Sequence, residues 1–347
     1  MKALILTNYN EFHYTDVLTP IPNSNEVLIR IKACSICGSD IHGYQGGSDR
    51  RIPPIIMGHE ASGIIEKLGD NVKNYKIGDR VTFDSTQYCG QCEFCQKQMT
   101  NLCNSRKVIG VSCDEFKNNG AMAEFVLVDA HTLYPLPDSV SFVEACLVEP
   151  FSVALHAVQL SNIQKSDRIV IIGDGTIGLL TLQAVLALGR ENEITLIGKH
   201  QTKLNTACSY PQVHTINKTN FEATQDNQSL NVMSGFDIIY DTVGTTSTMN
   251  DAFSYVKKGG KIICIGNTSK FVNFPLQECI TRQIQIYGSY SSSGEYSLAL
   301  KLMDEKAVDL SAFTKHIYPL SNGAQAFKLL TEKKTDLLKV ILKTENN

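Results

Sequence analysis

Short apolar runs divide the chain into two stretches of different character. In residues 1–150 these runs are strand-like, as in Glu26–Ala33, where β-branched residues alternate with charged ones. Turns that carry glycine and aspartate separate the runs, for instance at Gly69–Asn71. The pattern predicts a β-rich first part with irregular loops.

From about residue 152 the pattern changes to strands that alternate with helices. Arg168–Gly173 is a short apolar run closed by glycine, and Gly178–Leu188 contains strong helix formers that are apolar nearly all round. Further buried strands are predicted at Glu193–Ile197, Phe236–Asp241 and Gly260–Gly266. Such alternation favours an α/β fold with a doubly wound parallel sheet.

The C-terminal stretch carries two helical patterns, near Ser297–Met303 and Gly323–Glu332, and a strand pattern at Leu338–Leu342. We find no internal repeat and no low-complexity tract. A chain of 347 residues is expected to form two domains, at roughly 100–200 residues each.

Composition and charge exclude several classes of protein. The chain has 32 basic and 35 acidic residues, for a formal net charge of −3, without a long run of either sign. This balance argues against nucleic-acid binding and against a polybasic membrane anchor. No apolar stretch approaches the roughly 20 residues of a membrane span, and the apolar run at the N-terminus is too short for a signal peptide. We therefore expect a cytoplasmic protein.

Cysteine is the one unusually frequent residue, with 11 copies. Without a secretion signal, clustered cysteines more often bind metal than form a disulfide framework. Two-residue gaps let thiolates converge on one ion, and four thiolates fill a tetrahedral zinc shell. A structural zinc is therefore predicted at Cys89, Cys92, Cys95 and Cys103. Free or disulfide-linked thiols and an iron–sulfur cluster are the alternatives.

A second group of residues has the mixed chemistry of a catalytic zinc site. Such a site needs cysteine, histidine and carboxylate ligands, with one position left open. Cys37 and His59, together with Glu60 or Glu149, could supply the ligands.

A glycine-rich turn lies between the strand predicted at Arg168–Gly173 and the helix that follows it. The residues Gly173, Asp174, Gly175, Thr176, Ile177 and Gly178 fit the pattern G-x-G-x-x-G. The first glycine permits a tight turn, the second lets the backbone approach a pyrophosphate, and the third packs the helix against the strand. The helix, which is expected to begin around Thr176, then offers its free N–H groups to the phosphates. The turn predicts dinucleotide binding.

The end of the second predicted strand lacks the acidic residue that usually grips the ribose of NAD. Gly198 stands at that position and Lys199 follows it. Glycine leaves room for a 2′-phosphate and the adjacent cation attracts it. NADP(H) is therefore expected in preference to NAD(H), with Lys199 as the main contact and His200 and Lys203 as helpers. The alternative is that these cations are simply solvated.

Along essentially its whole length the chain resembles the zinc-dependent medium-chain dehydrogenases. The matching stretches are Cys37–His42, Gly58–Gly63, Gly78–Val81, the four-cysteine segment, Asn119–Phe125 and the glycine-rich turn. Glu60 after His59, and the segment Glu149–His156, are most similar to the polyol dehydrogenases. Members of that branch act on sorbitol, iditol, galactitol phosphate and related compounds, and threonine dehydrogenase is close to it.

The resemblance implies a two-domain architecture. A GroES-like β-rich catalytic domain is expected over residues 1–151, completed by residues 291–347, and a Rossmann domain over residues 152–290. The active site is expected in the cleft between them, and the protein is expected to form a homodimer or homotetramer.

The resemblance also assigns roles to individual residues. Cys37, His59 and Glu60 are expected to bind the catalytic zinc, while Glu149 lies close to the metal and ligates directly, acts through water or exchanges with substrate. Ser39 and His42 match the positions that carry the alcohol proton to solvent. The implied reaction is hydride transfer between NAD(P)(H) and a secondary alcohol or ketone of a polyol, sugar or sugar phosphate.

Other functions remain open at this point. A threonine-type or other zinc alcohol dehydrogenase shares the motifs, and a zinc-lacking quinone or enoyl reductase shares the fold but lacks the metal ligands. A zinc- and nucleotide-binding structural or sensor protein is the non-enzymatic alternative. Arg50 and Arg51 form a pair suited to phosphate recognition, although surface arginines commonly have no such role.

Overall fold

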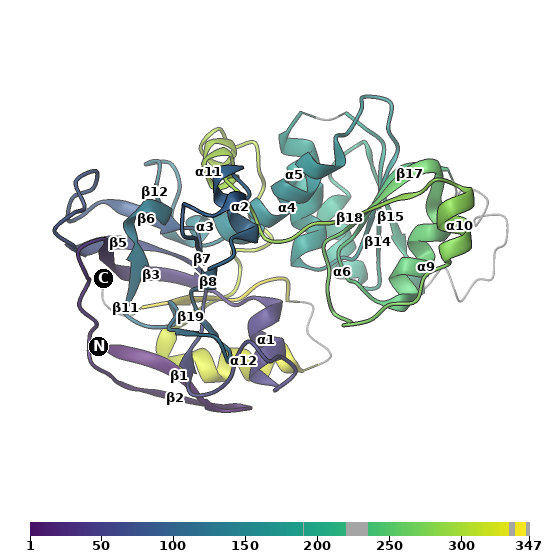
Figure 1. Cartoon of the computed structure of the whole chain (residues 1–347). Coiled ribbons are helices and arrows are strands. Elements are labelled where there is room, and N and C mark those ends of the chain that lie inside the picture. The colour runs from purple at the N-terminus through teal and green to yellow at the C-terminus, as the bar shows by residue number, and fades with distance from the viewer. Residues whose placement is uncertain (190, 220–234, 333–336, 345–347) are drawn as a thin grey trace. The chain divides into compact units, whose positions relative to one another are not determined.

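The structure is a computed structural model that describes residues 1–189, 191–219, 235–332 and 337–344 (Figure 1). The chain forms two compact units. The first comprises Met1–Glu149, Ser292–Lys306 and Leu310–Asn347. The second comprises Pro150–Ser291 and Ala307–Asp309.

A seven-stranded sheet organises the first unit. Its central strand, β3 (Glu26–Ser35), pairs antiparallel with β5 (Glu60–Leu68), β11 (Phe125–Asp129) and β20 (Ile341–Lys343). The strand order is β12-β6-β5-β3-β20-β19, so residues from both ends of the chain share one sheet. The remaining strands of this sheet are β6 (Arg80–Phe83), β12 (Leu133–Pro135) and β19 (Ile317–Pro319).

Three smaller sheets, with strand orders β2-β1-β4, β10-β9 and β7-β8, complete the β structure of the first unit. Their strands are β1 (Lys2–Asn8), β2 (Glu11–Asp16), β4 (Ile55–Ile56), β7 (Thr86–Gln87), β8 (Lys107–Val108), β9 (Val111–Ser112) and β10 (Lys117–Asn118). The α-helices of this unit are short: α1 (Gly38–Tyr44), α2 (Glu93–Gln96), α3 (Phe142–Ala145), α11 (Tyr296–Asp304) and α12 (Gly323–Thr331). Single 3-10 turns lie at η1 (Thr100–Leu102), η2 (Ala130–Thr132) and η4 (Leu320–Asn322).

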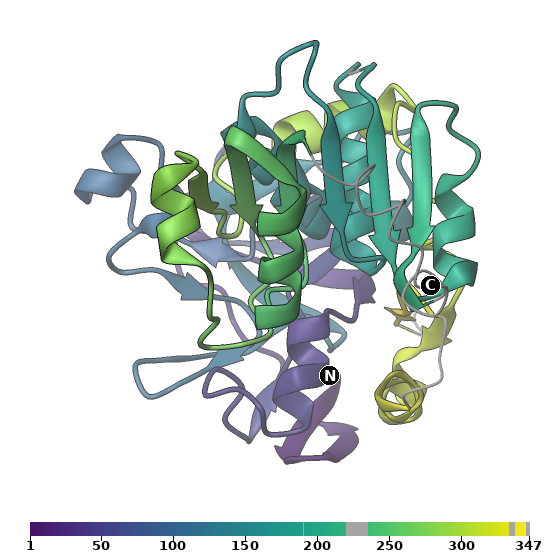
Figure 2. The same cartoon turned by 90° about the vertical axis from the view of Figure 1, so that its right-hand side faces the viewer.

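The second unit contains a six-stranded parallel sheet with the order β15-β14-β13-β16-β17-β18. In chain order this is 3-2-1-4-5-6, the doubly wound dinucleotide-binding arrangement. Figures 1 and 2 show the strands side by side, with α5 on one face and α9 on the other. The strands are β13 (Ile169–Ile172), β14 (Ile194–Gly198), β15 (Val213–Asn217), β16 (Phe236–Asp241), β17 (Val256–Cys264) and β18 (Gln285–Gly288).

One helix leads into this sheet and the others follow its strands; among them, α5 corresponds to the helix predicted at Gly178–Leu188. They are α4 (Val148–Ser161), α5 (Thr176–Ala187), α6 (Gln201–Leu204), η3 (Asn205–Ala207), α9 (Thr246–Tyr255) and α10 (Leu276–Thr281). β17 begins four residues earlier than expected, because its register against β16 shifts between Phe236 and Ile238. The α/β fold class, with a β-rich part and a parallel sheet, is confirmed.

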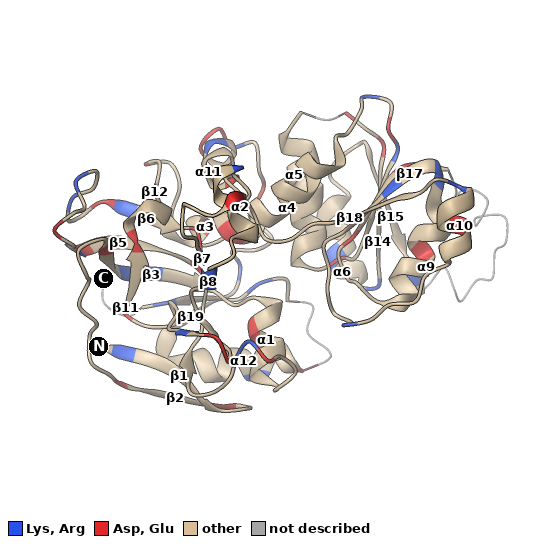
Figure 3. Cartoon of the chain, in the orientation of Figure 1, with Lys and Arg blue, Asp and Glu red and all other residues tan. Residues whose placement is uncertain are grey.

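The surface matches the balanced composition. Figure 3 shows basic and acidic residues interspersed along both units. Within the described ranges, no helix combines the length and the apolar character needed to cross a membrane.

The glycine-rich turn connects β13 to α5 and depends on two of its glycines for its shape. Gly173 has a φ of +117°, a conformation that side chains other than glycine rarely adopt. A Cβ on Gly178 would lie 1.9 Å from the carbonyl oxygen of Gly173, so only glycine lets α5 pack this closely on the turn. A Cβ on Gly175, the N-cap residue of α5, would meet nothing within 4 Å.

Because Gly178 is tightly packed and Gly175 borders open space, substitutions at the two positions should affect stability and cofactor binding differently. Gly178→Ala should lower Tm by several degrees, because overpacking of this kind costs about 1–3 kcal/mol. Gly175→Ala should leave Tm nearly unchanged but weaken dinucleotide binding, because its methyl group would occupy open space beside the helix N-terminus. Differential scanning calorimetry and cofactor titration measure the two effects, and equal melting of both variants would contradict the packing argument.

Candidate active site

Three potential metal ligands of the first unit converge on one point. Cys37 is the N-cap residue of α1, His59 directly precedes β5, and Glu60 is the first residue of β5. One ligand atom from each residue lies within 4.8 Å of the other two. Pairing of Ser35 with Glu60 in the β3–β5 ladder brings the ends of the two segments together. A thiol, an imidazole and a carboxylate suit zinc.

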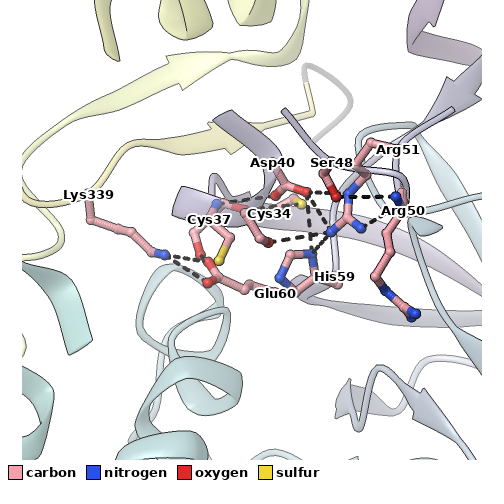
Figure 4. Close-up of polar contacts among 11 residues, drawn as sticks. Cys34, Cys37, Asp40, Ser48, Arg50, Arg51, His59, Glu60 and Lys339 are labelled. Atoms are coloured by element: carbon pink, nitrogen blue, oxygen red, sulfur yellow. Dashed lines mark hydrogen bonds and ion pairs between the residues drawn. The ribbon is translucent and has the colours of Figure 1, made fainter. Parts of the chain in front are cut away.

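A buried ion pair orients His59 (Figure 4). Asp40 on α1 is fully buried, and its Oδ1 accepts hydrogen bonds from Arg51 Nε at 3.2 Å and Nη2 at 3.1 Å. The same oxygen lies 3.5 Å from Nδ1 of His59. Burial opposes ionisation of Asp40, but His59 and Arg51 outweigh it and hold the pKa of the carboxyl well below its usual range. Arg51 Nη2 lies 3.5 Å from the same Nδ1. Because two groups already contact Nδ1, Nε2 is the ring nitrogen that would face a metal.

A second buried ion pair holds Glu60. Lys339 Nζ lies 2.6 Å from Oε2 and 2.8 Å from Oε1 of Glu60, and the Ser35 hydroxyl donates to Oε2. Lys339 approaches from the side opposite Arg51 (Figure 4). Burial alone would lower the pKa of Lys339, but the charge of Glu60 raises it well above its usual range. Lys339 therefore provides a buried cation in direct contact with both oxygens of Glu60.

The charges around the three ligands determine what metal binding requires. Although burial opposes it, the charge and hydrogen bond of Asp40, with help from Cys37, raise the pKa of His59 well above its usual value. A zinc ion binds neutral imidazole and thiolate, so loading this site releases protons. The donor set fits zinc.

Glu149 lies in the first turn of α4 and is not part of the group of three whose ligand atoms lie within 4.8 Å. Desolvation raises its pKa to about 7, with the charge of His59 opposing and that of Glu60 adding to the effect. The half-buried Glu149 therefore interacts electrostatically with the two ligands His59 and Glu60.

Ser39 and His42, the two residues expected to carry a proton, are both exposed on α1. Arg51 Nη2 donates to Ser39 Oγ at 3.4 Å, which leaves the serine hydrogen available for another acceptor. No hydrogen bond joins Ser39 directly to His42, both of which lie in the described part of the chain. A proton would need an intermediate group to pass between them.

The four-cysteine segment forms a second group with metal-ligand geometry. The sulfur atoms of Cys89, Cys92, Cys95 and Cys103 all lie within 4.8 Å of one another. Backbone N–H groups donate to these sulfurs, from Cys89 to Cys103 at 3.3 Å and from Cys92 to Cys89 at 3.4 Å. Hydrogen bonds from backbone N–H groups lower the pKa of Cys92 to about 6. Burial and the neighbouring thiols act in the opposite direction on Cys95, whose pKa is raised to about 12. Four sulfur donors in this geometry suit a closed zinc shell.

The second unit places the glycine-rich turn beside the end of β14. Ile172 of β13 is paired with Ile197 of β14, so Gly173 and Gly198 follow at neighbouring strand ends. Thr176 and Ile177 begin α5, while Lys199 and His200 are exposed and Lys203 is half-buried. The space beside Gly198 is not empty, because the side chain of Asp174 fills it.

Two expectations from the sequence need correction in the light of these contacts. Arg51 is only 5% exposed and is committed to Asp40, so it does not form a phosphate-binding pair with Arg50. Figure 4 shows the Arg50 guanidinium pointing away from this cluster. The ring of His200 lies 3.1 Å from Oδ2 of Asp174 and is likewise not a free cation.

Sequence reasoning missed the roles of four residues that shape the two sites: Asp40, Arg51, Asp174 and Lys339. One of them carried a readable signal, since Lys339 interrupts the apolar run Leu338–Leu342. A lysine inside a buried strand needs a counter-charge. The partners of the other three depend on contacts between segments, which residue spacing does not reveal.

Substitution of one cysteine in the four-cysteine segment should remove one metal ion from the protein. Cys95→Ser should lower the zinc content from about two ions per chain to about one and make residues 89–103 sensitive to proteolysis, because a structural zinc folds its own loop. Cys113→Ser, a cysteine of the same unit outside both clusters, is the control. Metal analysis that still finds two ions in Cys95→Ser would contradict the assignment.

Comparisons with known proteins agree along the whole chain. The family description "Alcohol dehydrogenase GroES-like domain" matches residues 23–138, and "Zinc-binding dehydrogenase" matches residues 176–305. D-arabitol-phosphate dehydrogenase of Enterococcus avium is 31% identical over 328 residues, covering 93% of this chain and 92% of that protein. Sorbitol dehydrogenase of Bacillus subtilis is 29% identical, with 99% and 97% covered.

A solved structure extends the likeness to three dimensions. Galactitol-1-phosphate dehydrogenase of Escherichia coli matches with a TM-score of 0.87 and 25% identity, covering 99% of this chain and 100% of that one. Taken together with the two clusters of metal-binding side chains, these matches show that the chain belongs to the family of zinc-dependent medium-chain alcohol and polyol dehydrogenases.

Proposed function

We propose that the protein is a zinc-dependent oxidoreductase that transfers a hydride between NAD(P)(H) and a secondary alcohol or ketone of a polyol, sugar or sugar phosphate. The observation that carries this proposal is the convergence of Cys37, His59 and Glu60 within 4.8 Å in the first unit. Membership of the dehydrogenase family supports the reaction class.

Cys37 and His59 would hold the catalytic zinc with Glu60 as third ligand. Glu149 would be an additional carboxyl that ligates the metal directly, acts through water or exchanges with substrate. When bound, zinc supplies Lewis-acid polarisation of the substrate oxygen, and the nicotinamide exchanges the hydride. Asp40 orients His59, and Lys339 balances the charge of Glu60. The chain's own task is to hold these groups in place without rearrangement during the reaction.

Ser39 is the proposed acceptor of the proton that leaves the substrate hydroxyl. Its hydroxyl can accept one proton while passing on another, and Arg51 already occupies one of its lone pairs. His42 is exposed on the same helix, where it could pass a proton on to solvent. We propose that an intermediate group connects the two residues.

The names of the relatives favour a polyol or a polyol phosphate as substrate. Two of the proteins reported above act on phosphorylated polyols and one on sorbitol. With Arg51 engaged by Asp40, Arg50 is the cation of this segment that remains for a phosphate group. A phosphorylated polyol is therefore our preferred substrate, and threonine or a simple alcohol is the alternative.

For the cofactor we propose a preference for NADP(H), with NAD(H) as the alternative. Lys199 is exposed and, among the described residues, has no ion-pair partner. Lys203 lies one turn further on in α6. His200 contributes less than the sequence suggests, because it faces Asp174.

We also propose that the protein is a homo-oligomer. The outermost strand, β18, is exposed at all four positions. Two of its own large apolar side chains are exposed, Ile286 at 38% and Tyr287 at 37%. An open strand edge with exposed apolar side chains is a surface that proteins normally cover, and a second copy of the chain is the proposed partner.

A substrate panel tests the reaction. Polyols, their phosphates, threonine and simple alcohols are each offered with both nicotinamide cofactors, and cofactor absorbance reports turnover. A polyol or polyol phosphate should give the highest kcat/KM, and Cys37→Ser should lower it by more than about 100-fold, since changes beside a metal ligand alone cost roughly 10–100-fold.

Arg50→Ala should raise KM only for phosphorylated substrates. Two bound zinc ions without turnover of any substrate would favour a structural or sensor protein.

The cofactor preference has its own test. Lys199→Ala should weaken NADP(H) binding by about 10–100-fold, because a hydrogen bond to a charged group contributes roughly 1.5–3 kcal/mol. Binding of NAD(H) should change little. Lys165→Ala, an exposed lysine that precedes β13 at the opposite end of the strand, is the control. A higher kcat/KM with NAD(H) for the unmodified protein would refute the preference.

A further inference from the structure

Gly198 stands where the usual acidic residue would be, yet an acidic side chain is present beside it. Asp174, the second residue of the glycine-rich turn, extends across the neighbouring strand ends toward β14. Its Oδ2 accepts hydrogen bonds from the backbone N–H of Lys199 at 2.7 Å and of His200 at 2.6 Å. Asp174 is only 7% exposed, so this carboxylate is directed into the protein.

Backbone and ring nitrogens lie around the carboxylate of Asp174. Besides the two backbone N–H groups, Nδ1 of His200 lies 3.1 Å from Oδ2 and 3.2 Å from Oδ1. Oδ2 accepts both backbone hydrogen bonds, the His200 ring contacts both oxygens, and only 7% of the residue is exposed, so little of this carboxylate is available to ribose hydroxyls. Its contacts instead fix the conformation of residues 198–200, from which the side chain of Lys199 extends into solvent.

Asp174 also excludes any side chain at position 198. A Cβ on Gly198 would lie 2.4 Å from Cβ, 2.6 Å from Cγ and 2.5 Å from Oδ2 of Asp174. Real side chains do not approach so closely, and the Cβ of Asp174 cannot rotate away as the tip of a flexible side chain could. Gly198 is therefore required by Asp174.

We infer that Asp174 is a specificity-positioning residue of the cofactor site, and that Asp174 and Gly198 act as a coupled pair. Asp174 takes the space of the usual acid at the end of β14, turns its charge inward and holds the turn that presents Lys199. This inference rests on the proposed dinucleotide site. It explains how the strand end can contain a carboxylate and still present a cation to the adenosine end of the cofactor.

Coupling predicts a result that neither residue gives alone. Gly198→Asp should not convert the site to NAD⁺, because the new side chain collides with Asp174; it should weaken both NAD⁺ and NADP⁺ by more than about tenfold. In the double variant Asp174→Gly/Gly198→Asp the space is free. The double variant should bind NAD⁺ at least about tenfold more tightly than Gly198→Asp does, while NADP⁺ stays weak because the exposed acid repels the 2′-phosphate.

The experiment measures Kd for both cofactors by titration of the zinc-loaded protein, with Asp174→Gly, Gly198→Asp, the double variant and the unmodified chain. Asp167→Asn, an acid of the same unit that accepts from the Gln164 N–H in a turn, is the control and should behave as the unmodified protein. If the two single changes multiply to within about twofold to give the double variant, the sites are independent and the inference is overturned.

Hydrogen exchange of the cofactor-free protein gives a second, independent measurement. Asp174→Gly should increase exchange at the amides of Lys199 and His200, and Asp174→Asn, which keeps one carbonyl oxygen as acceptor, should increase it less. Unchanged protection in Asp174→Gly would also overturn the inference. If the unmodified chain prefers NAD⁺, the proposed NADP(H) preference fails, while the coupling between positions 174 and 198 can still be measured with NAD⁺.

Discussion

The metal-ligand site of the first unit depends on one constraint: its buried acidic side chains need buried cations. Asp40 and Glu60 are both fully buried, and each needs a cation beside it. Arg51 and Lys339 supply these cations from other segments of the chain. Removing one partner of such a pair leaves an isolated charge in the interior, at a cost of about 3–5 kcal/mol. The positions of α1, β5 and the segment around Lys339 are therefore linked through electrostatics as well as through packing.

The same compensation prepares the site for a metal. Glu60 interacts with Lys339 and could also interact with an ion held beside Cys37 and His59. The three ligands are therefore held close together by contacts within the protein and not by the metal alone. Asp40 performs the matching task for His59, whose ring it fixes from the opposite side to the ligand nitrogen. Ligand geometry is thus largely established by residues that are not ligands.

The sequence predicted the elements well and the contacts between them poorly. Residues such as Cys89 and Gly178 could be interpreted because their chemistry depends on neighbours only a few positions away. The parallel strands were visible as apolar runs, and the fold class followed from their alternation with helices. Asp40, Asp174 and Lys339 obtain their roles from partners in other segments. In the last case the partner is 279 residues distant, and local patterns contain no record of such pairing.

In both the metal-ligand site and the dinucleotide site, a buried carboxylate fixes the position of neighbouring basic residues. Asp40 holds Arg51 and His59, and Asp174 holds His200 and the backbone beside Lys199. In each case the acid receives several donors and is hidden from solvent, so its effect on a ligand is indirect. Substituting either acid changes the position of other groups before it changes any contact with substrate.

The origin of Lys339 in the C-terminal segment has a consequence for biosynthesis. A ribosome must add 279 residues after Glu60 before the lysine that neutralises it exists, which takes roughly 15–60 seconds at typical elongation rates. The complete second unit emerges during that interval. Strands β19 and β20 of the seven-stranded sheet also come after the second unit in the chain, so this sheet cannot be complete before the residues of the second unit have been made.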